Sequence, residues 1–85
     1  MARVTMYSTA WCPFCRRAEA LRQRKGVLDL VKIEIDHDPP ARETMMIRSG
    51  RRSVPQIVID ETHVGGFDDL AALDRAGRLN ALLAA

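Results

Sequence analysis

The chain has 85 residues, 47% hydrophobic and 28% charged, with a formal net charge of +2. This length and balance predict one globular domain over residues 1–85 with one modest core, which we expect to be a monomer. The small net charge and 5% aromatic content argue against nucleic-acid binding. The sequence shows no secretory signal and no apolar run of about 20 residues, so we expect a cytoplasmic protein that does not bind a membrane.

The first half of the chain is predicted to form a strand, a helix and a second strand. Residues 3–8 and 31–36 each alternate in side-chain character, which is typical of a half-buried strand. Between them Ala18 and Leu21 recur at helical spacing, and Gly26 suits the end of that helix. A strand-helix-strand unit of this length predicts two parallel strands joined by a right-handed crossover.

The second half predicts a helix, a hairpin and a further helix. A helix begins after Asp38 and extends through 41–49, and a hairpin covers 56–64. Asp68 and Asp69 then cap a helix that stops near Gly77, and a short helical segment covers 79–83. The summed order predicts an α/β fold with a small mixed four-stranded sheet and helices on both faces.

Cys12 and Cys15 are the two cysteines of the chain. The loop between them is too short for a useful structural disulfide, and His37 and His63 lack the spacing of a zinc site. The pair lies where the first strand gives way to a helix, whose free N–H groups and positive end favour a thiolate at Cys12. We predict that Cys12 is the nucleophile and that Cys15, more buried, resolves the mixed disulfide. The alternative is two buried cysteines used as small hydrophobic residues.

Other charged side chains near this motif are given simpler interpretations. Arg16 and Arg17 add positive charge close to the cysteines, but on an exposed helix face they are interpreted as solvated surface residues. His37 and His63 are expected in surface loops, and we assign them no role.

Three segments in order resemble small bacterial glutaredoxins of the dithiol type, which have the thioredoxin fold. The segments are residues 7–15, with Cys12-Pro13-Phe14-Cys15, residues 53–57, with Val54-Pro55, and residues 65–70, with Gly65-Gly66-Phe67-Asp68-Asp69. The resemblance covers essentially the whole chain. It implies a thiol-disulfide oxidoreductase that has no permanently bound cofactor and uses glutathione as co-substrate. Its implied partners are glutathione and proteins that are disulfide-bonded or glutathionylated.

The resemblance also implies a glutathione site. Pro55 would be cis and face the active-site disulfide, and the Val54 backbone would pair with the glutathione cysteine. The γ-glutamyl end would lie against Phe67 and two aspartates that equally suit a helix cap. The residues implied to contact glutathione are Thr9, Phe14, Arg52, Val54, Pro55, Phe67, Asp68 and Asp69.

Two positions depart from the family pattern. Thr9 stands where many members carry a Lys that pairs with the glycyl carboxylate. Arg42, Arg51 or Arg52 could supply the missing charge, because a guanidinium suits a carboxylate, although exposed surface arginines are the simpler interpretation. Phe14 stands where the family often has Tyr, so the aromatic wall is kept and a hydroxyl is lost.

Two alternatives remain open at this point. The first alternative is a glutaredoxin-like reductase that takes electrons from thioredoxin reductase. A Trp before the first cysteine, here Trp11, is similar to thioredoxins and to those reductases, whereas the segment 65–69 favours glutathione. The second alternative is an iron-sulfur carrier with glutathione as co-ligand. Family members with that role typically have a small residue after the first cysteine, so Pro13 argues against it.

Overall fold

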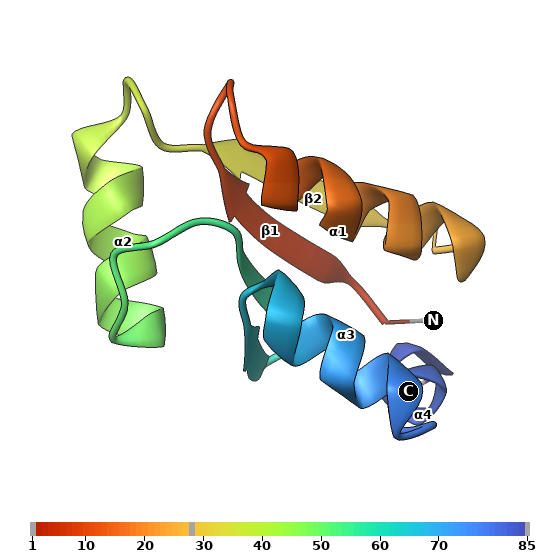
Figure 1. The fold of residues 1–85 in the computed structure, drawn as a ribbon. Helices are drawn as coiled ribbons and strands as arrows, with labels where there is room; N and C mark the ends of the chain where they lie inside the picture. The colour runs from red at the N-terminus through yellow and green to blue at the C-terminus, as the bar shows by residue number, and fades with distance from the viewer. Residues whose placement is uncertain (1, 28, 85) are drawn as a thin grey trace.

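The computed structural model describes residues 2–27 and 29–84, and its framework is a mixed four-stranded sheet (Figure 1). The strands are β1 (Val4–Ser8), β2 (Leu30–Glu34), β3 (Gln56–Ile59) and β4 (Thr62–Gly65), and they lie in the order β2-β1-β3-β4. β1 pairs with β2 in parallel, and the other two pairs are antiparallel. The predicted strand-helix-strand unit and the predicted hairpin are therefore confirmed.

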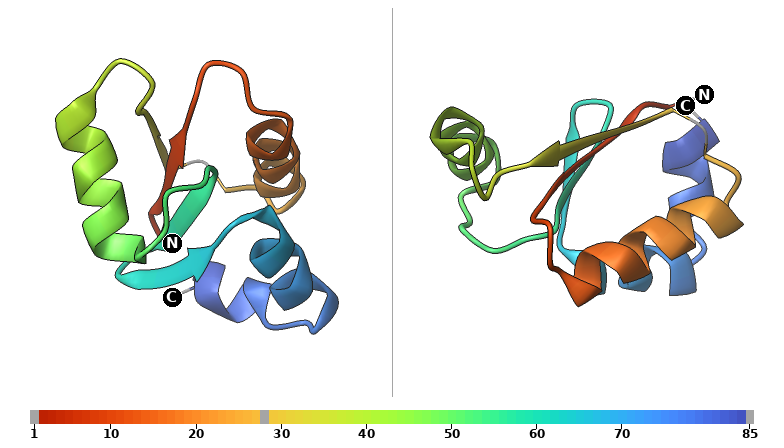
Figure 2. Two further views of the ribbon diagram at one scale, coloured as in Figure 1. Left: turned by 60° about the vertical axis from the view of Figure 1, so that its left-hand side comes forward. Right: turned by 90° about the horizontal axis from the view of Figure 1, so that it is seen from above.

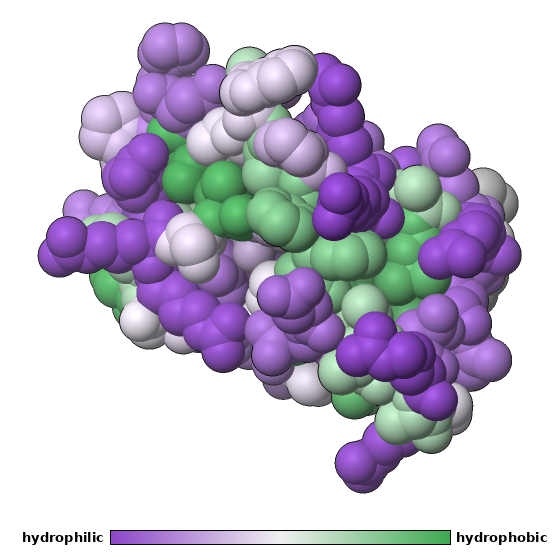
Figure 3. Space-filling model, viewed as in Figure 1, coloured by the Kyte–Doolittle hydropathy of each residue, from purple (hydrophilic) through white to green (hydrophobic). Residues whose placement is uncertain are grey.

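Helices cover both faces of this sheet, as predicted. They are α1 (Pro13–Arg24), α2 (Pro39–Ser49), α3 (Phe67–Arg75) and α4 (Leu79–Ala84). α2 covers one face alone, whereas α1, α3 and α4 lie together on the other face (Figures 1 and 2). In the space-filling view, apolar side chains form a band across the middle of the α1–α3 face, with hydrophilic side chains on both sides (Figure 3).

β1 is buried on both faces, which corrects the prediction of a half-buried strand. Met6 belongs to the larger core under α1 and α3, and Tyr7 belongs to a smaller core with Met45 of α2. Both side chains are 2% exposed. A central strand between helices on both faces has no solvent-facing side. β2 lies at the sheet edge, and there Val31 is 37% exposed.

A backbone hydrogen bond links the two ends of the described chain. The Ala2 N–H donates to the Leu83 carbonyl at 3.1 Å, which brings the termini to one side of the molecule (Figure 2).

Asp38 caps α2 by accepting from the Ala41 N–H at 3.1 Å, and Gly50 ends this helix at φ +70°. The segment from Gly50 to β3 then returns toward the N-terminus of α1. No helix within residues 2–27 and 29–84 is long and apolar enough to cross a membrane.

Candidate redox and ligand-binding site

Cys12 is the N-cap residue of α1, and Pro13 takes the first helical position. Cys12 has extended backbone angles (φ −149°, ψ 102°), and its Sγ accepts a hydrogen bond from the Cys15 N–H at 3.1 Å. The two cysteines are joined by a disulfide, with their Cα atoms 5.2 Å apart. Both are buried, Cys12 to 7% and Cys15 to 3% exposure. On reduction, the helix N-terminus and this N–H donor favour negative charge at Cys12 rather than at Cys15.

The loop before Cys12 is held by Asp36, which follows β2. The Ala10 N–H donates to Asp36 Oδ2 at 3.1 Å, and this bond is the main reason why the pKa of Asp36 lies below its ordinary value. Thr9 turns its hydroxyl into the same loop, where it donates to the Trp11 carbonyl at 3.2 Å. The side chain of Thr9 therefore helps to shape the loop before the nucleophile.

Exposed aromatic rings flank the cysteines, and arginines of α1 lie over them. Trp11 is 75% exposed, with the Arg16 guanidinium 5.0 Å from its ring centre. Phe14 is 49% exposed, and the Arg17 guanidinium lies 5.2 Å from its ring. Cation–π contacts at exposed sites are worth about 0.5–1 kcal/mol each. Both arginines are exposed, which agrees with their interpretation as surface residues, and each also lies over an aromatic ring.

A groove of about 210 Å³, open to solvent, lies next to the cysteine pair. Its walls come from the end of the 50–55 segment, from the start of α3 and from Phe14, whose ring centre is 6.4 Å from that of Phe67. The Val54–Pro55 peptide bond is cis, which confirms the expectation from the resemblance. Val54 and Phe67 also pack on the core cluster that contains both cysteines.

Comparison with known proteins identifies this arrangement. Residues 4–64 match the family model of glutaredoxin. A glutaredoxin from Pseudomonas aeruginosa is 55% identical over 85 residues, which is 100% of both chains. Glutaredoxin 3 from Escherichia coli K12 is 51% identical over 83 residues, covering 98% of this chain and 99% of the relative. This chain belongs to the glutaredoxin family.

Solved glutaredoxin structures have the same fold. The crystal structure of a buckwheat glutaredoxin–glutathione complex gives a TM-score of 0.88 at 26% identity, covering 98% of this chain and 77% of that one. The solution structure of a Brucella melitensis glutaredoxin gives 0.84 at 46% identity, covering 98% and 89%. The predicted thioredoxin fold and dithiol type are therefore confirmed. Family and fold together support a thiol-disulfide oxidoreductase.

The groove of this glutaredoxin brings together most of the residues that the sequence pointed to. Those lining it are Phe14, Val54, Pro55, Phe67, Asp68 and Asp69, together with Arg51, Ser53 and Gly66. Thr9 and Arg52 do not line it. Of the three arginines considered as a replacement for the missing Lys, Arg51 is the one at the groove. Within residues 2–27 and 29–84, no three His, Cys, Asp or Glu side chains gather as a metal site would require.

Asp69 links the start of α3 to the segment that follows α2. Its Oδ2 accepts from the Arg51 guanidinium at 3.0 Å and from the N–H of Gly66, the N-cap residue of α3, at 2.9 Å. These two bonds hold the pKa of Asp69 below its ordinary value of 3.8, and the bond from Arg51 has the larger effect. The sequence predicted that Asp68 and Asp69 both cap this helix, and the structure gives the capping bond to Asp69.

The lowered pKa of Asp69 predicts an acid-sensitive contribution to stability. A carboxyl whose pKa is lower in the folded state stabilises the fold above its unfolded pKa, and this contribution is lost as pH falls through the folded pKa. We expect the wild type to be more stable than Asp69→Asn by a constant amount between about pH 5 and pH 7, with the difference shrinking below about pH 4. Urea unfolding of both proteins at each pH measures it. A difference that does not change with pH would contradict the assignment.

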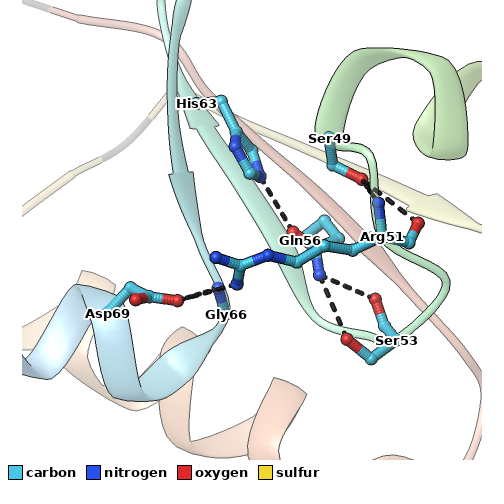
Figure 4. A network of polar contacts seen from close by, with 7 residues as sticks. All are labelled: Ser49, Arg51, Ser53, Gln56, His63, Gly66 and Asp69. Atoms are coloured by element: carbon cyan, nitrogen blue, oxygen red, sulfur yellow. Dashed lines mark hydrogen bonds and ion pairs between the residues drawn. The ribbon is translucent and has the colours of Figure 1, made fainter.

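His63 and Gln56 form a polar contact that the sequence did not predict. His63 was expected in a surface loop, and this is wrong: it lies in β4, half-buried, with its Nε2 2.9 Å from Gln56 Oε1 (Figure 4). Strand alternation could have found the pair. Gln56 and Val58 point to one face of β3, and His63 is the β4 residue opposite Val58.

Proposed function

We propose that this glutaredoxin reduces protein disulfides and glutathionylated proteins, with Cys12 as the nucleophile and the cytoplasmic glutathione pool as the reductant. The observation that carries the proposal is the groove beside the cysteine pair, walled by Val54 and cis Pro55 on one side and by the start of α3 on the other. A relative of the same fold binds glutathione in its crystal structure, which supports the same ligand here.

The groove offers partners for the cysteine and for the γ-glutamyl end of glutathione. The Val54 backbone would pair with the cysteine of the tripeptide. The first N–H groups of α3, at Phe67 and Asp68, would receive the γ-glutamyl carboxylate, because N–H groups in the first turn of a helix have no partner within it. Arg51 contacts Asp69 through one nitrogen, so its guanidinium adds positive charge at the same end of the groove, where it would assist in binding the γ-glutamyl carboxylate.

The reaction proceeds by successive thiol-disulfide exchanges. The Cys12 thiolate attacks the glutathione sulfur of a glutathionylated protein, the protein leaves as a thiolate, and Cys12 becomes joined to glutathione. A second glutathione thiolate then attacks the bound glutathione sulfur, which releases oxidised glutathione and restores the Cys12 thiolate. With a protein disulfide, Cys12 forms a mixed disulfide with the protein. Cys15 then attacks the Cys12 sulfur and releases the reduced protein, leaving the Cys12–Cys15 disulfide. One glutathione thiolate attacks the Cys12 sulfur of that disulfide and frees Cys15, and a second attacks the bound glutathione sulfur, which releases oxidised glutathione and restores the Cys12 thiolate.

Coupled assays test the choice of reductant. One supplies glutathione, glutathione reductase and NADPH, and a parallel assay supplies thioredoxin reductase and NADPH, both with a glutathionylated peptide or a protein disulfide as substrate. We expect NADPH oxidation in the glutathione assay. Turnover with thioredoxin reductase alone would overturn the proposal and reduce the role of Asp69 to a helix cap.

The role of Arg51 predicts a large difference between neighbouring arginines. Arg51→Gln removes a charge at the groove, and a hydrogen bond between charged groups is worth about 1.5–3 kcal/mol, so we expect roughly a ten-fold or greater rise in KM for glutathione. Arg52→Gln changes the next residue, which does not line the groove, and should raise KM much less. Steady-state kinetics of both variants measure the contrast. Equal effects would show that long-range charge, rather than contact at Arg51, attracts glutathione.

A further inference from the structure

We propose that His63 is a positioning residue for the groove: acting through Gln56, it fixes the Ser53 carbonyl (Figure 4), and it thereby fixes the Val54–Pro55 edge. Its effect on turnover rests on the proposed function, since it matters there only if Val54 receives the glutathione cysteine. The hydrogen-bonded chain His63–Gln56–Ser53 starts on β4, passes through the first residue of β3 and ends next to the cis peptide bond.

The orientation of this chain follows from its donors and acceptors. The Ser53 carbonyl can only accept, so the nitrogen of the Gln56 amide must face it, and Nε2 lies 2.9 Å from that carbonyl and 3.3 Å from Ser53 Oγ. The Gln56 oxygen then faces His63, whose Nε2 must carry a hydrogen. His63 therefore donates through Nε2 both as a neutral ring and as an imidazolium, because the second proton would go to Nδ1.

The hydrogen bond from His63 is important because Gln56, which accepts it, is buried. Gln56 is 1% exposed, so its amide oxygen depends on His63 for its hydrogen-bond donor. A buried polar group left without a partner costs more than the hydrogen bond was worth, and the Gln56 side chain would move to recover one. Movement of Gln56 in turn releases the Ser53 carbonyl. Loss of His63 should therefore make the groove less rigid at Ser53, one residue before Val54.

Other anchors hold different parts of the same segment. Near its start, the Arg51 N–H donates to Ser49 Oγ at 3.1 Å, and the Ser49 hydroxyl donates to the Met45 carbonyl at 2.7 Å. The guanidinium of Arg51 also contacts Asp69. The Gln56 bonds act at the far end, at Ser53. Removing His63 should therefore loosen Ser53 and Val54 while the part around Ser49 stays in place.

The decisive experiment combines nuclear magnetic resonance with kinetics on four proteins: wild type, His63→Leu, His63→Gln and Gln56→Met. Leucine removes the donor, glutamine offers an N–H at a similar reach, and methionine removes the amide that His63 acts through. We expect the backbone order parameters of Ser53 and Val54 to fall in His63→Leu and Gln56→Met, to recover in His63→Gln and to stay unchanged at Ser49. On a glutathionylated peptide, we expect roughly a five-fold loss of kcat/KM, mainly through KM, in the two disrupted variants.

The double variant His63→Leu/Gln56→Met and the control His37→Gln complete the test. If His63 acts through Gln56, the double variant should match Gln56→Met alone, because both substitutions break one chain. His37 is exposed in the turn after β2, and its replacement should leave both measurements unchanged. Wild-type order parameters in His63→Leu, failure of glutamine to restore them, or additive losses in the double variant would each overturn the proposal. Lack of glutathione-dependent turnover in the wild type would overturn the proposed function instead, while the order parameters still decide the role of His63.

Discussion

Cys12→Ser is expected to abolish turnover of both a glutathionylated peptide and a protein disulfide. A serine hydroxyl stays protonated at neutral pH and does not attack sulfur, so neither substrate can form its mixed disulfide with the protein. Removing a nucleophile typically costs several orders of magnitude, and we expect kcat/KM to fall at least about 10³-fold. The glutathione-reductase-coupled assay measures both activities. Because the substitution replaces one sulfur atom by oxygen and changes the side-chain volume little, the fold should be retained. Far-ultraviolet circular dichroism checks this.

Cys15→Ser is the matched control for that loss. Deglutathionylation needs one thiol, because glutathione itself resolves the Cys12 mixed disulfide, so we expect this activity to survive. Reduction of a protein disulfide by the two-thiol route needs Cys15 and should be abolished. The asymmetry follows from their places in α1: Cys12 is the N-cap residue and Cys15 lies one turn inside, at 3% exposure. Loss of both activities, or survival of deglutathionylation in Cys12→Ser instead, would contradict this division of labour.

The sequence predicted the parts of this site that depend on local chemistry. The strand-to-helix turn that makes Cys12 an N-cap residue is encoded within a few residues, by the end of an alternating segment and by Pro13 at the first helical position. The end of α2 at Gly50 is equally local. Elements of this kind depend on neighbours in sequence, so the periodicity and end signals of one chain suffice to predict them.

Contacts between distant segments could not be predicted in the same way. The alternation in β1 indicates two faces, but its burial on both depends on which strands flank it and on α2 packing under Tyr7. Arg51 and Asp69 are 18 residues apart, and their contact is set by how two connections meet at the sheet edge. In the sequence, Arg42, Arg51 and Arg52 were equivalent candidates to supply the missing positive charge. Only the geometry distinguishes Arg51, which lines the groove, from Arg52, which does not.

Gly65→Ala is expected to weaken the fold and glutathione binding together. Gly65 has φ +119°, outside the regions that L-residues favour, so a side chain there strains the backbone. A Cβ would also meet the Asp69 carboxylate, whose Cγ would lie 2.8 Å away, and the Arg51 guanidinium at 3.1 Å. Strain and loss of the Asp69 capping bond together should lower the free energy of unfolding by about 3 kcal/mol. Urea denaturation measures this loss, and the KM for glutathione reports on Arg51.

Gly77→Ala separates the two causes. Gly77 also has a positive φ, +72°, but a Cβ there has no atom within 4 Å, so alanine costs backbone strain alone, about 1–2 kcal/mol. This substitution should leave the KM for glutathione unchanged. If the two variants lost equal stability, the contact with Asp69 would add nothing to the strain at Gly65. If Gly65→Ala kept its affinity for glutathione despite the larger loss, then displacing Arg51 and Asp69 would not matter to the ligand, and the groove would have to hold glutathione through Val54 and the N-terminus of α3 alone.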